Sequence, residues 1–162
     1  MDIKILIETI SVPDEYNIIL GQSHFIKTVE DLYEACINCM PGIEFGIAFS
    51  EASGPCLVRK DGTDSEIIDI AVQNIMKIAA GHVFLIVLKN AFPINVLPAI
   101  KDCREVVNIF CATANPVQVI LAETEQGRGV LGVIDGSSPK GVELDSDIAN
   151  RKNFLLNIGY KR

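Results

Sequence analysis

The sequence predicts a single α+β domain, residues 1–162, in which helices cover a mixed β-sheet. Apolar runs of strand length alternate along the chain with amphipathic helical segments, and neither a low-complexity segment nor a long linker divides them. Apolar residues make up 49% of the 162 residues. A chain of this size and composition can bury a core without disulfides or metal ions.

Four strands and two helices are expected in the first half of the chain. A hydroxyl at Thr28 and acids in the next turn start the first helix, which ends at Pro41-Gly42. Thr63 is expected to cap the second helix, which ends at Gly81. The expected strands are residues 3–10, 16–20, 45–49 and 56–59.

The second half begins with residues 83–88, an apolar run expected to form a central strand buried on both faces. Residues 92–98 contain two prolines and are predicted as a loop that leads into a helix through Arg104. Strands are expected at 106–112, 117–122 and 130–134, and the last 20 residues are expected to form a helix with an ordered tail.

Charge and hydropathy exclude several classes of partner. The net charge is −7, and no basic cluster is larger than a Lys-Arg pair, which argues against binding to nucleic acid or to an anionic membrane. No apolar run approaches the ~20 residues that a membrane-spanning helix needs, and no leader peptide is recognised. We expect a soluble, cytoplasmic protein. The mean hydropathy of +0.31 is high for a monomer and favours a homo-oligomer.

The five cysteines also favour a reducing compartment, because their number is odd and most lie within apolar segments. Cys36 and Cys39 have CxxC spacing. A redox or zinc site would need a second CxxC or a histidine pair nearby, and the sequence has neither. We interpret both cysteines as ordinary helix residues.

Two polar loops that follow apolar runs predict a ligand pocket. Residues 45–55 form a strand that continues into a loop with Glu51, Ser53 and a Gly-Pro break. Residues 109–116 repeat this plan, ending in Thr113, Asn115 and a proline. Loops of this kind commonly close on one small-molecule site in layered α/β proteins.

The only two histidines, His24 and His82, both stand where the chain changes direction. Either could act as an acid, a base or a phosphate carrier. If the strands run roughly parallel, His24 shares one edge of the sheet with the polar loops and His82 lies at the other edge, whereas antiparallel pairing reverses this. On the parallel assumption His24 ranks first. A structural, hydrogen-bonded histidine is the alternative for each.

Three further side chains are candidates for binding an anion or for catalysis. Lys27 lies three residues after His24 and could steady a phosphate. Arg128 is flanked by glycines, so a ligand could approach it closely. Glu51 follows a buried strand, where a carboxylate has either a functional role or a hydrogen-bonded role in a turn. The sequence has neither a GxxxxGK[ST] loop nor a GxGxxG turn.

Six blocks of sequence together resemble the archaeal and bacterial family of adenosine-specific kinases. The resemblance spans essentially the whole chain. It implies an α/β/β/α layered sandwich, a homo-oligomer (trimer or hexamer) with sites near subunit interfaces, adenosine or AMP as the ligand, and a histidine that can hold a phosphoryl group. The six blocks are residues 21–31, 45–55, 80–82, 92–97, 112–116 and 132–136.

The resemblance also implies roles for individual residues. It carries over His24 and His82 as candidates for the phosphorylated histidine. A nucleoside triphosphate is the expected phosphate donor and would normally bring Mg²⁺, for which Glu51, Glu123 and Asp135 are the available acids. Lys27 could supply positive charge and Phe92 part of an adenine slot. The implied ligand or phosphate contacts are Glu51, Ser53, Asn95, Thr113, Asn115 and Arg128.

Two functions from different classes are consistent with these residues. One is a phosphotransferase that phosphorylates adenosine through, or alongside, a phosphohistidine. The alternative is a non-catalytic adenosine or AMP sensor in which a histidine only contacts phosphate. The absence of a standard ATP-binding loop favours the sensor, and the two histidines at loop junctions favour the enzyme.

Overall fold

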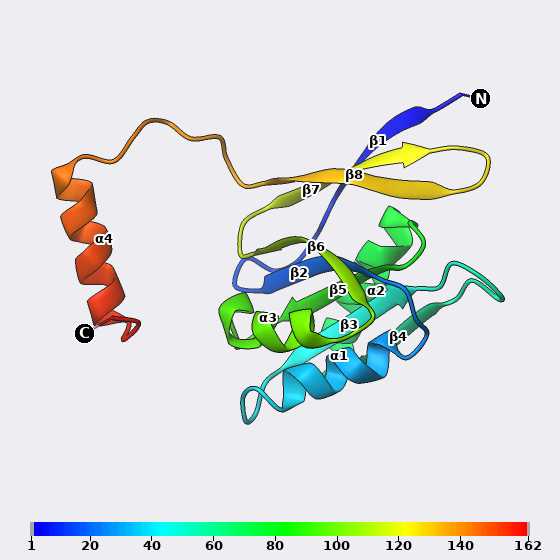
Figure 1. Cartoon of the computed structure of the whole chain (residues 1–162), viewed down its shortest axis with the longest axis horizontal. Helices are drawn as coiled ribbons and strands as arrows, with labels where there is room; N and C mark the ends of the chain where they lie inside the picture. Colours follow the sequence, from blue (N-terminus) through cyan, green and yellow to red (C-terminus); the bar gives the residue numbers. More distant parts are fainter. Residues whose placement is uncertain (1, 162) are drawn as a thin grey trace.

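The computed structural model describes residues 2–161, which form an α+β fold of two antiparallel sheets and four helices (Figure 1). The elements run in the order β1 (Lys4–Thr9), β2 (Asn17–Ser23), α1 (Thr28–Ile37), β3 (Phe45–Ser50), β4 (Val58–Gly62), α2 (Ser65–Ile78), β5 (Val83–Leu88), α3 (Pro93–Asp102), β6 (Val106–Thr113), β7 (Val117–Glu123), β8 (Arg128–Asp135) and α4 (Asp145–Asn157).

Five strands form the large sheet, in the order β4-β3-β5-β2-β6. The expected layered α+β class is confirmed, but all five strands pair antiparallel instead of forming the predicted mixed sheet. The strand order explains the difference. Helices α2 and α3 join strands that run in the same direction, but a strand of opposite direction lies between the members of each such pair, β3 between β4 and β5 and β2 between β5 and β6. β5 is central and fully buried, as its apolar run predicts.

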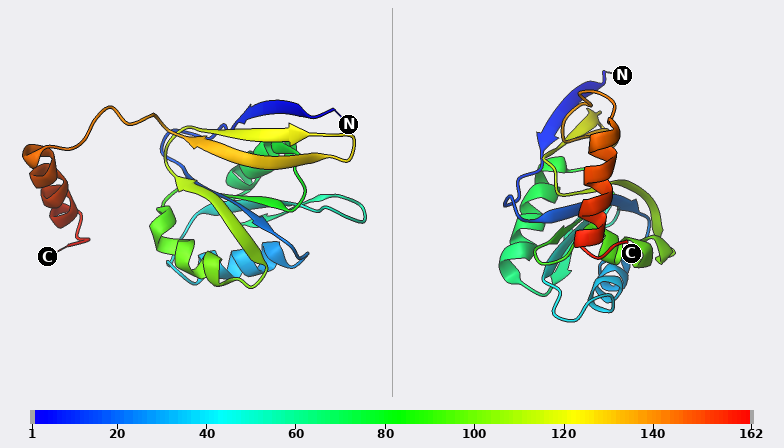
Figure 2. Two further views of the ribbon diagram at one scale, coloured as in Figure 1. Left: turned by 45° about the horizontal axis from the view of Figure 1, so that its top comes forward. Right: turned by 90° about the vertical axis from the view of Figure 1, so that its left-hand side faces the viewer.

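Each face of the large sheet has its own apolar core, because neighbouring side chains of a strand point to opposite faces. Ile19 of β2 packs beneath α1 and α3 with Leu32 and Val96, whereas Ile18 and Leu20 pack on the other face. Helices α1 and α3 therefore make one outer layer of the molecule (Figure 2).

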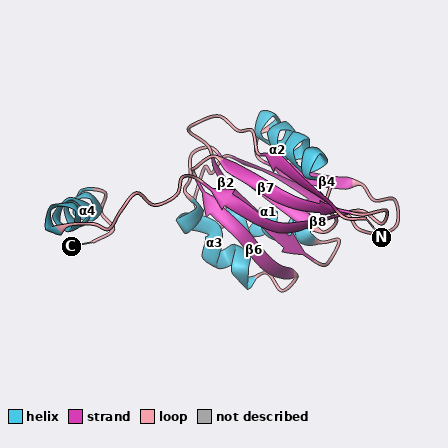
Figure 3. Cartoon of the chain, turned by 90° about the horizontal axis from the view of Figure 1, so that it is seen from above, coloured by secondary structure: helices cyan, strands magenta, loops and turns pink. Residues whose placement is uncertain are grey.

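The other face of the large sheet is shared by α2 and a small sheet of order β1-β7-β8 (Figure 3). Leu121 of β7 and Ile75 of α2 belong to the same buried cluster. Gly46 of β3 allows α2 to lie close, because a Cβ there would come within 2.4 Å of the backbone nitrogen of Ile68. The layers are thus helices, large sheet, and then α2 beside the small sheet.

Several predicted boundaries differ from the structure, including the end of α1 at Ile37, and three of the differences concern α2 and α3. Asp64, not Thr63, caps α2, and its Oδ1 accepts from the Glu66 and Ile67 amides at 2.8 and 3.2 Å. That helix ends at Ala79 in a left-handed conformation instead of at Gly81. The predicted loop 92–98 is largely helical, because a proline at the first position of α3 suits a helix start.

The C-terminal helix forms as expected but stands apart from the body. A linker, residues 136–144, leads away from β8, and Figure 1, the left view of Figure 2 and Figure 3 show α4 at a distance from both sheets. No residue of α4 is buried. We call residues 136–161 the arm. Among residues 2–161, no helix has the length and apolar character required to cross a bilayer.

Candidate functional site

Antiparallel pairing brings both histidines to the same edge of the large sheet. The amide of Ser23, at the end of β2, donates to the carbonyl oxygen of His82 at 2.9 Å. The His82 amide in turn donates to the carbonyl oxygen of Ser50, at the end of β3, at 2.8 Å. His24 follows Ser23 directly. We call this end of the sheet, where β2 and β3 end and β5 begins, the histidine edge. It also carries Glu51 and Ser53.

The expectation that all the polar loops share one edge with His24 is wrong. Because β5 and β6 run antiparallel to β2, the loops that follow them open at the opposite edge of the sheet. The ranking of His24 above His82 therefore loses its basis. The candidates at the opposite edge are Phe92, Asn95, Thr113 and Asn115.

A cleft of about 990 Å³ opens beside the histidine edge. Three segments that are distant in the sequence line it: the β3–β4 loop, the α2–β5 turn and the β7–β8 hairpin. Glu51, Gly81 and Arg128 are among the lining residues, and His82 directly follows Gly81. A parallel bridge between Ala80 and Arg128 joins the turn to the hairpin.

Backbone strain is concentrated at this cleft. Within residues 2–161, only three residues other than glycine have positive φ: Cys56 at 52°, Ala79 at 50° and His82 at 61°. The first two line the cleft and the third adjoins it. Left-handed backbone is unfavourable for such residues and is found most often at ligand-binding and catalytic sites. The strain thus singles out this cleft among the hollows of the molecule.

Three contacts fix the position of His82. Its two backbone hydrogen bonds fix it between β2 and β3, and its ring stacks on Phe49 with centroids 6.0 Å apart and planes 10° from parallel. The ring is half-buried. Neither ring nitrogen makes a hydrogen bond with the part of the chain that the structure describes, so a lone pair remains available.

His24 is exposed and lies beside a network of charges. Its amide donates to the carbonyl oxygen of Glu105 at 3.1 Å. The ammonium of Lys27 pairs with Asp31 and lies 3.6 Å from Oε2 of Glu105. Asp31 and then Glu105 raise the pKa of Lys27, which keeps the ammonium charged.

Glu105 is a residue of this site that the sequence analysis missed. Its side chain is only 2% exposed, and neither carboxylate oxygen has a hydrogen-bond partner among the described residues. A buried carboxylate is costly without a partner, and Lys27 is the cation nearest to it. The sequence did contain a signal for Glu105: this carboxylate directly precedes the apolar run of β6, just as Glu51 directly follows β3.

The Glu51 carboxylate binds two other residues at the ends of its own loop. Its carboxylate accepts from the Leu57 amide at 2.9 Å and from Nε and Nη2 of Arg59 at 2.7 and 2.6 Å. The Leu57 amide, with Arg59, holds the pKa of Glu51 below its usual range. A carboxylate with these partners is a poor general base, so the interpretation as a hydrogen-bonded turn accounts for Glu51 better than a catalytic role. Ser53 lies exposed in the same loop.

Arg128 connects the small sheet to α2. Its Nε donates to Glu123 at 2.6 Å, and its Nη1 donates to the carbonyl oxygen of Lys77 at 2.9 Å, in the last turn of α2. Glu8 lies 3.9 Å from Nη1. A cation at a helix C-terminus is electrostatically favourable, so Arg128 has a structural role at the cleft wall.

The candidates at the opposite edge are also part of hydrogen-bonded structure. Asp135 Oδ1 accepts from Thr113 Oγ1 at 2.9 Å and from Asn115 Nδ2 at 3.0 Å. Asn95 accepts from the Phe92 amide at 2.8 Å and so caps α3. The ring of Phe92 is exposed. These residues do not meet the histidines within one chain.

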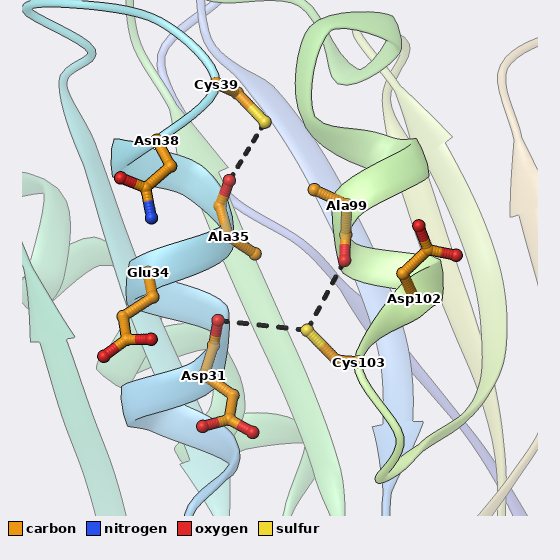
Figure 4. Close-up of a pocket in the computed structure, with 8 residues that line it drawn as sticks. All are labelled: Asp31, Glu34, Ala35, Asn38, Cys39, Ala99, Asp102 and Cys103. Carbon is orange, nitrogen blue, oxygen red and sulfur yellow. Dashed lines mark hydrogen bonds between the residues drawn. The ribbon is translucent and has the colours of Figure 1, made fainter.

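A second hollow, of about 450 Å³, lies between α1 and α3 (Figure 4). Asp31, Glu34 and Asp102 make its lining acidic, which disfavours a phosphate. The Cys103 thiol donates to the Ala99 carbonyl oxygen at 3.5 Å, and burial raises the pKa of this thiol to about 11. Burial raises the pKa of Cys36 to about 12. Both thiols are therefore protonated near neutral pH and poorly nucleophilic.

The three acids named for Mg²⁺ do not come together. Glu51 pairs with Arg59, Glu123 pairs with Arg128, and Asp135 lies at the opposite edge of the sheet with Thr113. Across residues 2–161, no group of three or more histidine, cysteine or acidic side chains is placed to hold a metal ion. The residues present do not fit a Mg²⁺ site made by the protein alone.

Comparison with known proteins identifies the family. The model of the family described as "Adenosine specific kinase" matches residues 8–161. The chain belongs to the adenosine-specific kinase family. A crystal structure of the PH1918 protein from Pyrococcus horikoshii OT3 is similar, with 45% sequence identity and a TM-score of 0.95, and the match covers 99% of each chain. A search of curated proteins found no significant match.

Membership of the adenosine-specific kinase family confirms the resemblance found in the sequence. The match to the solved structure extends through the arm, because it covers nearly the whole chain. A TM-score this high requires the arm to have a closely similar position in both structures. The separated helix is thus common to two chains that differ at more than half of their positions.

Proposed function

We propose that this protein transfers a phosphoryl group from a nucleoside triphosphate to adenosine, forming AMP, through a phosphohistidine at the histidine edge. The observation that carries the proposal is the position of His82 beside the cleft of about 990 Å³. Its backbone is strained, its ring stacks on Phe49, and its ring nitrogens make no hydrogen bond with the described residues. Membership of the family supports adenosine as the substrate.

The chemistry takes two steps. A neutral imidazole nitrogen attacks the terminal phosphorus of the triphosphate, so that an N–P bond forms, a P–O bond breaks and the diphosphate leaves. The 5′-hydroxyl of adenosine then attacks the phosphohistidine, the N–P bond breaks, and the hydroxyl proton passes to the released imidazole or to water. Mg²⁺ would arrive with the triphosphate, because residues 2–161 contain no acid cluster placed to hold it.

The cleft suits a nucleoside in size and lining. Its volume of about 990 Å³ lies at the upper end of the range for small-molecule sites. Ala52, Ala79 and Ala122 offer small apolar surfaces for a base, while Thr124 and Gln126 offer hydrogen bonds. We assign adenosine to this cleft and the reacting phosphate to the side nearest His82.

A specific observation favours the sensor as the second candidate. Phosphoryl transfer needs cations that are free to meet the migrating charge. Yet Lys27, Arg59 and Arg128 each pair with a carboxylate of the same chain. A protein that only binds adenosine, which is uncharged, has no need of free cations, so the paired charges fit binding without turnover.

We also propose a homo-oligomer, a trimer or hexamer, in the cytoplasm. Many large apolar side chains remain exposed on the single chain, which favours association. All five cysteines are free thiols, which suits a reducing compartment.

The decisive experiment compares His82→Asn, His24→Asn and the wild type. Asparagine tolerates left-handed backbone, so His82→Asn removes the nucleophile while keeping the turn. Each protein is incubated with triphosphate labelled in the terminal phosphate, and acid-labile label is counted before and after adenosine is added. We expect His82→Asn to lose the label and His24→Asn to keep it.

Two results would overturn parts of the proposal. Loss of label in His24→Asn alone would move the phosphohistidine to His24. No label on the wild type, with adenosine still binding in calorimetry, would establish the sensor and exclude the kinase.

A further inference from the structure

We propose that the hollow between α1 and α3 binds an aliphatic polyamine, a flexible chain that carries several ammonium groups. This hollow lies in the outer helical layer, apart from the cleft assigned to adenosine, and the inference does not depend on the proposed phosphoryl transfer. It rests on the charge of the lining, the positions of its acids, its apolar floor and a buried carboxylate behind it.

The lining of the hollow is negative. Asp31 and Glu34 come from α1 and Asp102 from the end of α3, and none of the eight lining residues is basic. Helix α1 has no lysine, arginine or histidine between Thr28 and Ile37. Lys101, the neighbour of Asp102, lines a different hollow beside β6. The lining therefore attracts cations and contributes none itself.

The three acids of the lining do not form a metal site. Figure 4 shows Glu34 and Asp102 on opposite flanks of the helix pair, with Asp31 nearer one end. Across residues 2–161, no group of three or more histidine, cysteine or acidic side chains is placed to hold a metal ion. A ligand that meets all three acids must be extended and carry several positive charges. A polyamine has both properties, because its ammonium groups are charged near neutral pH, as in lysine, and are joined by methylenes.

The floor of the hollow suits a methylene chain. Ala35 and Ala99 lie between the two outer acids, and their side chains are small and apolar (Figure 4). Their carbonyl oxygens accept from the thiols of Cys39 and Cys103, at 3.0 and 3.5 Å. A thiol is a weak donor, so these oxygens can also accept an ammonium N–H. The volume of about 450 Å³ is within the range of small-molecule sites.

A buried carboxylate lies directly behind one end of the hollow. Glu105 is only 2% exposed, and neither of its carboxylate oxygens has a hydrogen-bond partner among the described residues. Burial, and then the charges of Glu105 and Asp31, raise the pKa of the Cys103 thiol. Asp31 and Glu105 also share Lys27. The Glu105 carboxylate therefore faces the end of the hollow where Asp31 and Cys103 lie.

Charge at this end of the hollow is unbalanced. The single ammonium of Lys27 serves two carboxylates, and it is hydrogen-bonded to Asp31 but 3.6 Å from Glu105. A buried charge without full compensation is costly. A ligand ammonium placed against Asp31 would supply the second positive charge, and further ammonium groups would reach Glu34 and Asp102. The ligand thus needs three charged nitrogens, as in spermidine.

The test titrates the full-length protein with spermidine and follows backbone amide resonances by NMR. We expect the amides of residues 31–39 and 99–103 to shift. Glu34 and Asp102 are exposed, so Glu34→Gln and Asp102→Asn should fold normally and each weaken binding by about fivefold. Glu30→Gln removes the same charge from α1 outside the lining. It is the matched control and should leave the affinity unchanged within about twofold.

Simpler cations separate binding of a polyamine from general attraction of charge. Butylamine, which has one ammonium, should bind about 25-fold more weakly than spermidine, and Mg²⁺ should not shift these resonances at the same concentration. Absence of shifts with spermidine, equal shifts with Mg²⁺, equal affinity for butylamine, or equal losses in Glu30→Gln and Asp102→Asn would each overturn the proposal. Adenosine binding by these variants is a separate readout, so failure of this inference is distinct from failure of the kinase.

Discussion

The imidazole of His82 stacks on the ring of Phe49 while its amide is bound to the residue that follows Phe49, Ser50. Phe49 is fully buried under α1 and α3. The stack therefore ties the strained turn after α2 to the core on the other face of the large sheet. Movement of this turn would disturb both faces, which gives His82 a fixed position relative to the cleft.

Ala79→Gly should stabilise the protein. Ala79 ends α2 at φ 50°, a conformation that glycine adopts without strain. We expect the free energy of unfolding to rise by about 1 kcal/mol. Urea denaturation measures it. Ala71→Gly, in the buried middle of the same helix, is the control and should lower stability; equal effects at both positions would contradict the assignment of strain to Ala79.

Glu51→Gln should change how stability depends on pH. The folded state lowers the pKa of Glu51 below 4.5, mainly through the Leu57 amide and then through Arg59. The charged carboxylate therefore contributes its full stabilisation above pH 4.5, and this contribution is lost as the pH falls through the folded pKa. The variant should be less stable than wild type near neutral pH, and the difference should shrink in acid.

Unfolding curves at several pH values test this prediction for Glu51. Glu66→Gln is the control, because the Glu66 carboxylate has no ion pair among the described residues. A constant difference between Glu51→Gln and wild type at every pH would show that the loop does not depend on the charge of Glu51.

Lys27→Met should destabilise the protein by leaving Glu105 buried without its cation. Adding Glu105→Gln to this variant removes the buried charge, so we expect the double variant to recover much of the loss. Thermal unfolding of the wild type, both single variants and the double variant measures the coupling. Additive effects would mean that the 3.6 Å approach between these residues contributes no coupling energy.

Asn115→Ala should lower stability without weakening the binding of adenosine. Its side chain and Thr113 both donate to Asp135 at the edge opposite the histidines. Loss of one such hydrogen bond costs about 1 kcal/mol. Calorimetric titration with adenosine measures the affinity. A large loss of affinity would instead place the opposite edge of one copy against the cleft of another.

Local patterns in the sequence were sufficient for the elements but not for their arrangement. The apolar run 83–88 predicted a buried strand and the residues after Thr63 predicted a helix, and both form. Strand direction was not determined, because a chain that passes through one helix can return to pair either way. The predicted position of His82 depended on that direction, which is why sequence placed it at the wrong edge under the parallel assumption.

The candidate site was predicted in part for the same reason. Residue types identified His82 and Glu51, since both stand at strand ends. The strain at Ala79 and the isolation of Glu105 arise from tertiary contacts, which no local pattern records. The partners of Arg128 likewise come from α2 and β7, and so from the packing of the small sheet.

The cleft joins segments around residues 51, 80 and 128, which belong to the large sheet, to α2 and to the small sheet. A molecule bound there contacts the large sheet, α2 and the small sheet at once. It is released when any of these three parts separates from the other two. Occupancy is thus linked to global opening of the fold. Amide protons deep in both sheets should exchange with solvent more slowly when the cleft is filled, even those far from any ligand atom.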